Sequence, residues 1–158
     1  MNQASLSKRL KLLVLLVFLC ALVVYTVALP LITAHYTPFS ESSTARFAWL
    51  GMIWLTAVPL YLALAYAWQI ATRIGQNRSF SRENALALRR ISTLALIDTV
   101  FLLLGNVLLC LVGMNRLTLL VFSLLFCFLG FLLTVAAAAL SHLVQRAADL
   151  QEESDLTI

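Results

Sequence analysis

The chain alternates between long apolar runs and short polar segments. The apolar runs cover residues 11–33, 47–71, 91–113 and 117–141. A membrane core of roughly 30 Å needs about twenty helical residues at 1.5 Å each, which these runs supply. The pattern therefore predicts an all-α polytopic membrane protein. We expect a single domain over residues 1–158, in which four transmembrane helices form two antiparallel hairpins.

Polar segments between and after these runs predict a linker over residues 72–90 and a helical C-terminal tail over 142–158. Gly75 is expected to end the second span, since glycine adopts a left-handed conformation at no steric cost. Ser81 is placed to cap a new helix, which leads directly into the third span or lies along the membrane surface. In the tail, Leu143 and Leu150 recur at helical spacing, so we expect an amphipathic helix beyond the membrane.

Proline and tryptophan positions refine the first two spans. The ring of Pro30 removes a backbone donor and is expected to end the first span. Trp49 and Trp68 are nineteen residues apart, a separation of roughly 28 Å in a helix. We therefore expect them to lie at opposite membrane interfaces.

Composition supports a membrane location. The chain is 62% hydrophobic and 11% charged, far from the soluble average of roughly half apolar and a quarter charged. The net charge of +4 comes from clusters between apolar runs, so it indicates membrane orientation rather than direct binding of nucleic acid. Cys20, Cys110 and Cys127 lie inside the predicted spans without CxxC spacing, and we expect them to act as apolar side chains.

The distribution of Lys and Arg predicts the orientation. Nine of these residues lie before the first span, in the linker or in the tail, whereas only Arg46 and Arg116 lie in the other two connections. The excess predicts that both termini and the linker face the cytoplasm of a bacterial inner membrane.

Small and weakly polar residues recur along one face of the fourth span. Such stripes allow membrane helices to pack closely, because lipid provides no hydrophobic drive for association. The stripe consists of Ser123, Cys127, Gly130, Thr134, Ala137 and Ser141.

Asp98 is the one acidic residue inside an apolar run. An ionisable group at membrane depth is costly, and such groups commonly mark functional sites. Residues counted inward from the ends of the spans put Asp98, Thr134 and Tyr66 at similar membrane depths. We therefore predict that Asp98 faces the bundle interior and bonds to Thr134 or Tyr66. The residue could be a structural lock, which we favour, or a proton relay.

The linker and the tail carry opposite charge, with five Arg and Glu83 in the linker and Arg146 against four acidic residues in the tail. These segments could attract each other or bind a partner. Alternatively, the Arg residues contact anionic lipid and the tail is merely soluble. The predicted docking surface consists of Arg78, Phe80, Ser81, Arg82, Asn84, Arg89, Arg90, Asp149, Glu152, Glu153 and Asp155.

Catalytic and metal-binding patterns are missing from the sequence. His35 and His142 are predicted on opposite sides of the membrane, and there is no glycine-rich phosphate loop or HExxH motif. We therefore expect no enzymatic activity, no cofactor and no metal site.

Two motifs resemble those of bacterial membrane proteins catalogued as domain of unknown function 2975. The likeness covers nearly the whole chain in layout. It implies four spans, no established activity and a partner, since many members lie beside a gene for a small helix-turn-helix regulator of the Cro/C1 type. The motifs are Gly75-x-x-x-x-Phe80-Ser81-x-x-Asn84-x-x-x-Leu88-Arg89-x-Ile91 and Leu140-Ser-His-Leu-x-x-x-Ala147-x-x-Leu150-Gln-Glu-Glu-x-Asp-Leu-Thr-Ile158.

Three functions follow as hypotheses. The first is a non-enzymatic inner-membrane protein that docks a small cytoplasmic DNA-binding regulator. The second is a small transporter, or a transporter subunit, that uses Asp98; it is expected to form homo-oligomers because four spans enclose little cavity. A membrane enzyme is third.

Overall fold

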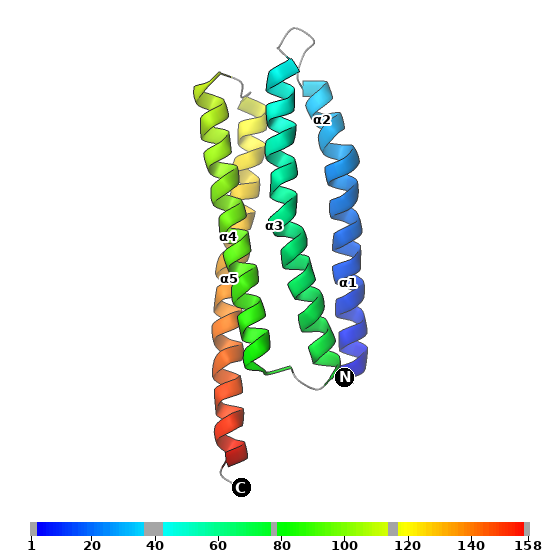
Figure 1. The fold of residues 1–158 in the computed structure, drawn as a ribbon, viewed down its shortest axis with the longest axis vertical. Coiled ribbons are helices and arrows are strands. Elements are labelled where there is room, and N and C mark those ends of the chain that lie inside the picture. The colour runs from blue at the N-terminus through cyan, green and yellow to red at the C-terminus, as the bar shows by residue number, and fades with distance from the viewer. Residues whose placement is uncertain (1–2, 37–42, 77–78, 114–116, 157–158) are drawn as a thin grey trace.

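The computed structural model describes residues 3–36, 43–76, 79–113 and 117–156. Every regular element in these ranges is helical, and the long helices run antiparallel to their neighbours (Figure 1). The all-α prediction is therefore confirmed. The elements are α1 (Gln3–Val23), the π-helical turn η1 (Val24–Ala28), α2 (Leu29–Tyr36), α3 (Ser43–Gly75), α4 (Arg82–Leu111) and α5 (Leu117–Leu156).

Four stretches are long and apolar enough to cross a membrane: Ser5–Ile32, Phe47–Gly75, Arg82–Leu111 and Leu120–Ser154. The outward faces of the helices carry large exposed Leu, Val and Phe side chains along most of their length. Leu12 on α1 and Phe128 on α5 are examples, at 64% and 60% exposed. Lipid is the solvent in which such faces are stable.

The helices contact one another in chain order. The unit formed by α1, η1 and α2 packs on α3, α3 packs on α4, and α4 makes its most extensive contact with α5. Among the described residues, α1 and α5 do not touch each other at the backbone level. Helices α3 and α4 therefore each have a neighbouring helix on both sides, and their polar side chains can contact groups on either neighbour.

Pro30 does not end the first helix, contrary to the sequence prediction. The chain continues as α2 to Tyr36, and the preceding turn widens into η1, where Leu29 N–H donates to the Val24 carbonyl. A π-helical turn changes the register of the backbone hydrogen bonds. This local change accommodates the missing N–H of Pro30 without breaking the helix.

Gly75 ends α3 as predicted, but for a different physical reason. Among the described glycines only Gly113 has a positive φ, of 72°. At Gly75, a Cβ would lie 2.7 Å from Ser7 Oγ of α1. Ser7 Oγ also donates a 2.6 Å hydrogen bond to the carbonyl of Ala71. Gly75 is therefore needed for the close approach of α1 and α3.

The Trp49 side chain is buried between helices, so it is not exposed as an interfacial anchor would be. It is 4% exposed and forms the apolar core with Ile53, against which Tyr25 and Leu109 pack. Trp68 is 43% exposed, and Lys11 Nζ lies 5.5 Å from its ring centroid. Of the two residues, Trp68 has the exposure and the neighbouring cation that suit an interfacial anchor.

The last helix extends well past the other helices at the end where the chain begins (Figure 1). The start of α1, the α3–α4 connection and the tail of α5 all lie there. We call this the basic end, after Lys8, Arg9, Lys11, Arg73, Arg82, Arg89, Arg90 and Arg146. The predicted tail helix is present, while its Leu143 and Leu150 are exposed, at 65% and 67%.

Candidate functional sites

Four side-chain hydrogen bonds join α4 to α5, and they recur at near-heptad intervals. Ser141 Oγ donates to the Ala85 carbonyl at 2.7 Å and Ser92 Oγ to the Thr134 carbonyl at 2.9 Å. Further along, Cys127 Sγ lies 3.9 Å from the Thr99 carbonyl, and Ser123 Oγ donates to Asn106 Oδ1 at 2.8 Å. On α4 the four positions are seven residues apart, so one face of each helix forms a polar seam.

The small-residue stripe of α5 faces this seam. Ser123, Cys127, Thr134, Ala137 and Ser141 are all at most 9% exposed. The stripe also includes Gly130, where a Cβ would overlap Thr99 Oγ1 of α4. Close packing of α4 on α5 therefore requires a glycine at this position.

Asp98 lies on α4 eight residues beyond Arg90, or roughly 12 Å along the helix. Its Oδ1 atom is buried and has no hydrogen-bond partner in the part of the chain that the structure describes. The two hydroxyls expected to bind it have other contacts: Thr134 Oγ1 donates to the Gly130 carbonyl at 2.9 Å, and Tyr66 Oη lies 3.4 Å from Arg90 Nη1. The structure thus does not join Asp98 to either hydroxyl.

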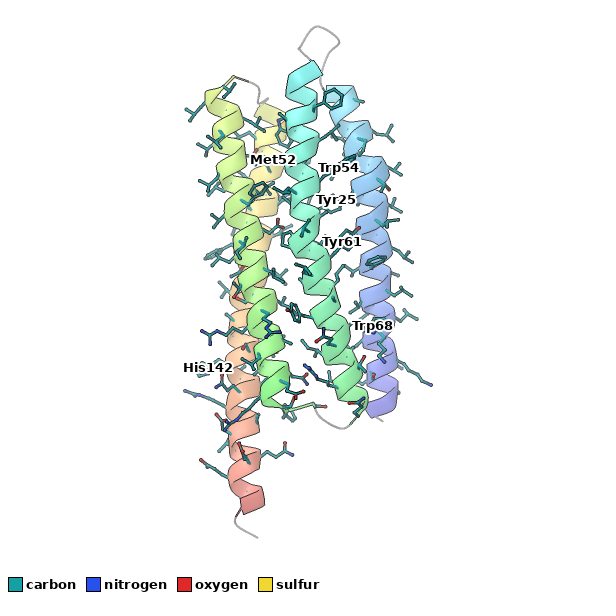
Figure 2. All side chains as sticks on the ribbon, in the orientation of Figure 1. Tyr25, Met52, Trp54, Tyr61, Trp68 and His142 are labelled. Atoms are coloured by element: carbon teal, nitrogen blue, oxygen red, sulfur yellow. The ribbon has the colours of Figure 1, made fainter. Side chains whose placement is uncertain are left out.

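A hydroxyl pair joins η1 to α3 within the bundle. Tyr25 Oη on η1 and Thr56 Oγ1 on α3 are 2.9 Å apart. The Tyr25 and Tyr61 ring centroids are 6.5 Å apart. Figure 2 shows Tyr25 and Tyr61 about halfway along the bundle. Sequence reasoning did not single out Tyr25 or Thr56, because isolated Tyr and Thr residues are common in membrane helices.

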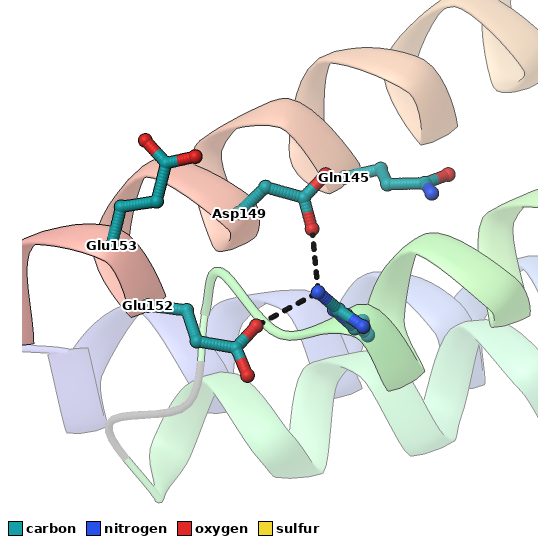
Figure 3. Close-up of a pocket in the computed structure, with 5 residues that line it drawn as sticks. Gln145, Asp149, Glu152 and Glu153 are labelled. Carbon is teal, nitrogen blue, oxygen red and sulfur yellow. Dashed lines mark ion pairs between the residues drawn. The ribbon is translucent and has the colours of Figure 1, made fainter. Parts of the chain in front are cut away.

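At the basic end, Arg82 joins the start of α4 to the tail of α5. Its Nη2 atom lies 3.2 Å from Asp149 Oδ1 and 2.8 Å from Glu152 Oε2 (Figure 3). These residues, with Gln145 and Glu153, line a shallow pocket that is open to solvent. Of the alternatives that the opposite charges of the linker and the tail left open, mutual attraction therefore has a contact at Arg82.

The start of α4 is fixed by its own capping residues. Ser81 Oγ accepts from the Asn84 N–H at 3.3 Å, as the sequence predicted for an N-cap. Asn84 is 1% exposed, and its Nδ2 donates to the Ser79 carbonyl at 3.0 Å. Arg73 at the end of α3 pairs with Glu83 at 3.2 Å, which holds the two helix ends together.

The other predicted docking residues are spread around the basic end. Phe80 is 59% exposed, and Arg89 is exposed on α4. The Arg90 guanidinium lies over the Tyr66 ring, 5.4 Å from its centroid. Arg78 and the side chain of Asp155 lie outside the part that the structure describes.

Among the residues that the structure describes, no group of three or more His, Cys, Asp or Glu side chains could hold a metal ion. The carboxylates among these residues are those of the tail, Glu83 and the partly buried Asp98.

Comparison with known proteins gives a family but no activity. The family model described as "Protein of unknown function (DUF2975)" matches residues 30–158. A relative from Bacillus subtilis (strain 168), described as "Uncharacterized membrane protein YoaS", is 30% identical over 129 residues, covering 79% of this chain and 81% of the relative. No solved structure matches the chain.

Proposed function

Starting from the fact that the chain belongs to the DUF2975 family of membrane proteins, we propose that it is a non-enzymatic docking protein of the bacterial inner membrane. In this proposal the basic end faces the cytoplasm. The partner is a small helix-turn-helix regulator, of the kind that the family resemblance implies.

The contact of Arg82 with Asp149 and Glu152 is the observation that carries this proposal. It holds the tail of α5 against the start of α4, so the tail forms an ordered surface that extends beyond the other helices. Without the positive charge of Arg82, less would offset the repulsion among neighbouring carboxylates in the tail. One outward face of the tail presents Leu143 and Leu150, which are exposed.

The chemistry of the tail suits a regulator of this type. DNA-binding proteins carry clustered Lys and Arg on the surface that contacts phosphates. The tail offers the acidic residues Asp149, Glu152 and Glu153 to such a surface. Binding of the tail to such a basic surface would keep the regulator from DNA and hold it at the membrane.

The test is co-purification of the tagged protein, in mild detergent, with a helix-turn-helix regulator encoded beside its gene. We expect a complex that is lost after truncation beyond Ser141. Because truncation also removes the contacts of Ala148, a double variant, Asp149→Asn with Glu152→Gln, tests the charges with little change in shape. A Leu150→Ala variant separates the apolar contribution. Elution of full-length protein and regulator in separate peaks would contradict the proposal.

Transport is a second candidate, favoured by the buried and unpartnered Oδ1 of Asp98. Polar groups at membrane depth commonly mark transport pathways. Proton flux into liposomes containing the parent or the Asp98→Asn variant tests it, and equal flux in the two would reject a proton role in transport.

A further inference from the structure

Two cations of the basic end lie over aromatic rings of α3. Lys11 Nζ is 5.5 Å from the centroid of the Trp68 ring, and the Arg90 guanidinium carbon is 5.4 Å from the centroid of the Tyr66 ring. Tyr66 and Trp68 are two residues apart, a separation of roughly 3 Å along the helix axis. The two contacts therefore bring Lys11 of α1 and Arg90 of α4 to similar depths in the bundle.

This depth coincides with one boundary of the membrane core. The first three candidate spans end, away from the basic end, at Ile32, Phe47 and Leu111. Counted from those ends, Lys11, Trp68 and Arg90 each lie 21 residues away, or roughly 32 Å along a helix. The hydrocarbon core of a bilayer is roughly 30 Å thick. Lys11, Trp68 and Arg90 therefore lie at the depth where the phosphate groups of lipids begin.

Arg90 brings a positive charge to this boundary without a carboxylate partner in the described ranges. The ion pairs there join Arg73 to Glu83 and Arg82 to the tail. These pairs lie further from the membrane, since Arg82 is eight residues before Arg90, roughly 12 Å along α4. The anion that suits the position of Arg90 is therefore one that lies at the boundary itself, as a lipid phosphate does.

The Tyr66 hydroxyl provides a second donor beside Arg90. Arg90 Nη1 donates to Tyr66 Oη at 3.4 Å, and the direction of this bond is fixed because a guanidinium has no acceptor. Tyr66 therefore keeps its own hydroxyl proton for another acceptor. A guanidinium has five N–H donors in a planar fork that matches the geometry of phosphate. Together the two side chains suit a phosphate group.

Exposed apolar side chains continue from this pair toward the membrane centre. On α3, Leu62 and Val58 lie about one and two turns beyond Tyr66, and on α4 Ile97 lies about two turns beyond Arg90. All three are exposed. Their helical spacing puts them on the same side of each helix as the polar residue. A molecule held by its phosphate at Arg90 and Tyr66 would thus find an apolar surface for its hydrocarbon chains.

We propose that Arg90 and Tyr66 form a binding site for an anionic phospholipid, in the leaflet at the basic end. The lipid phosphate accepts from the guanidinium and from the phenol hydroxyl, while the acyl chains lie against the exposed side chains of α3 and α4. A lipid with net negative charge binds better than a zwitterionic lipid, because the headgroup of the latter brings its own cation. This site goes beyond the docking function and does not depend on it.

The test is a lipid titration of the purified full-length protein in detergent, with bound lipid counted by native mass spectrometry. The probes are phosphatidylglycerol and phosphatidylethanolamine with identical acyl chains, and we expect the parent protein to bind phosphatidylglycerol more tightly. Glycerol 3-phosphate at the same concentration should not displace the lipid, because it lacks the acyl chains. Displacement would show that the ligand is a soluble phosphate and would overturn the lipid assignment.

Three variants test the residues of the site. Arg90→Gln should weaken the binding of phosphatidylglycerol roughly tenfold, as expected for the loss of a hydrogen bond between charged groups. Arg89→Gln is the matched control, because it removes the same charge from the exposed neighbouring position; its affinity should stay close to that of the parent. Tyr66→Phe keeps the ring beside Arg90 and removes only the hydroxyl, so it should weaken binding by a smaller factor, roughly threefold.

Gel filtration of each variant at the elution volume of the parent shows that the fold is kept, and Tyr66→Phe tests the site even if Arg90→Gln does not fold. Equal weakening by Arg90→Gln and Arg89→Gln would show diffuse attraction to positive charge and would overturn the site. Equal affinity for the two lipids, or unchanged binding in Tyr66→Phe, would overturn it as well. No regulator and no flux enter these measurements, so their failure is distinguishable from failure of the docking or transport functions.

Discussion

Ser92 Oγ on α4 donates a 2.9 Å hydrogen bond to the backbone carbonyl oxygen of Thr134 on α5. Both residues are buried, and this bond lies in the seam between the two helices that pack most extensively. Because the bond joins a side chain to the backbone of another helix, it fixes the register of α4 against α5 as well as adding stability.

Ser92→Ala should therefore lower the stability of the protein, by about 0.6 kcal/mol if the bond has the average strength of interhelical hydrogen bonds in membrane proteins. Equilibrium unfolding of the detergent-solubilised protein measures the change. Thr93→Val, at the exposed neighbouring position, should be close to neutral. Equal losses in the two variants would show that the seam bond contributes no stability of its own.

At Gly130 the same seam has no room for a side chain. Gly130→Ala places a Cβ against Thr99 Oγ1, and Thr99 is β-branched, so its side chain has few alternative rotamers. We expect a loss of about 1–3 kcal/mol, typical of an overpacked contact, and a lower midpoint of thermal unfolding.

Gly51→Ala is the matched control for Gly130. A Cβ at Gly51 would meet nothing within 4 Å, although this glycine is also in a transmembrane helix. Since alanine favours helix more than glycine does, the control should be neutral or slightly stabilising. A stable Gly130→Ala protein would mean that α4 and α5 can separate at this point without cost.

The α4–α5 contact illustrates what could be predicted from the sequence. Small residues on α5 recur at steps of three and four, and this pattern identified the buried face of that helix. The partner positions on α4, which are Ala85, Ser92, Thr99 and Asn106, are also seven residues apart. They were missed because leucines and other large side chains separate them.

Individual partners and backbone adjustments were not predictable in the same way. The predicted partners of Asp98 rested on depth alone, whereas the direction of each side chain depends on helix rotation. Pro30 was expected to end the helix because proline has no backbone N–H. The sequence does not reveal the π-helical turn η1, which accommodates this missing donor. Trp49 was assigned to an interface by spacing, and only packing shows that it is buried.

The ion pairs of Arg82 should order the tail more than they stabilise the whole protein. The side chains of Arg82 and Glu152 are 66% and 61% exposed, and pairs this exposed contribute at most about 1 kcal/mol. Arg82→Ala should thus speed amide hydrogen exchange in residues 145–153 while leaving the unfolding midpoint nearly unchanged.

Arg89→Ala is the control, because it removes an exposed Arg from the same helix. Raising the salt concentration should reproduce the effect of Arg82→Ala on the parent protein, since exposed pairs are screened. Exchange in the tail that is unaffected by both treatments would show that packing of Ala148 alone orders it.

The orientation proposed for the protein follows from the nine basic residues that precede the first span or belong to the linker and the tail, against two in the other connections. Cysteine labelling tests it in a background with Cys20, Cys110 and Cys127 replaced by Ala. Ser79→Cys, in the α3–α4 connection, should react with a membrane-impermeant maleimide only after the cells are permeabilised. Ser42→Cys, before α3, should react in intact cells, because positively charged segments are retained on the cytoplasmic side. The reverse pattern would place the tail outside the cytoplasm, where it could not bind a DNA-binding regulator, and would thereby reject the docking function independently of any binding experiment.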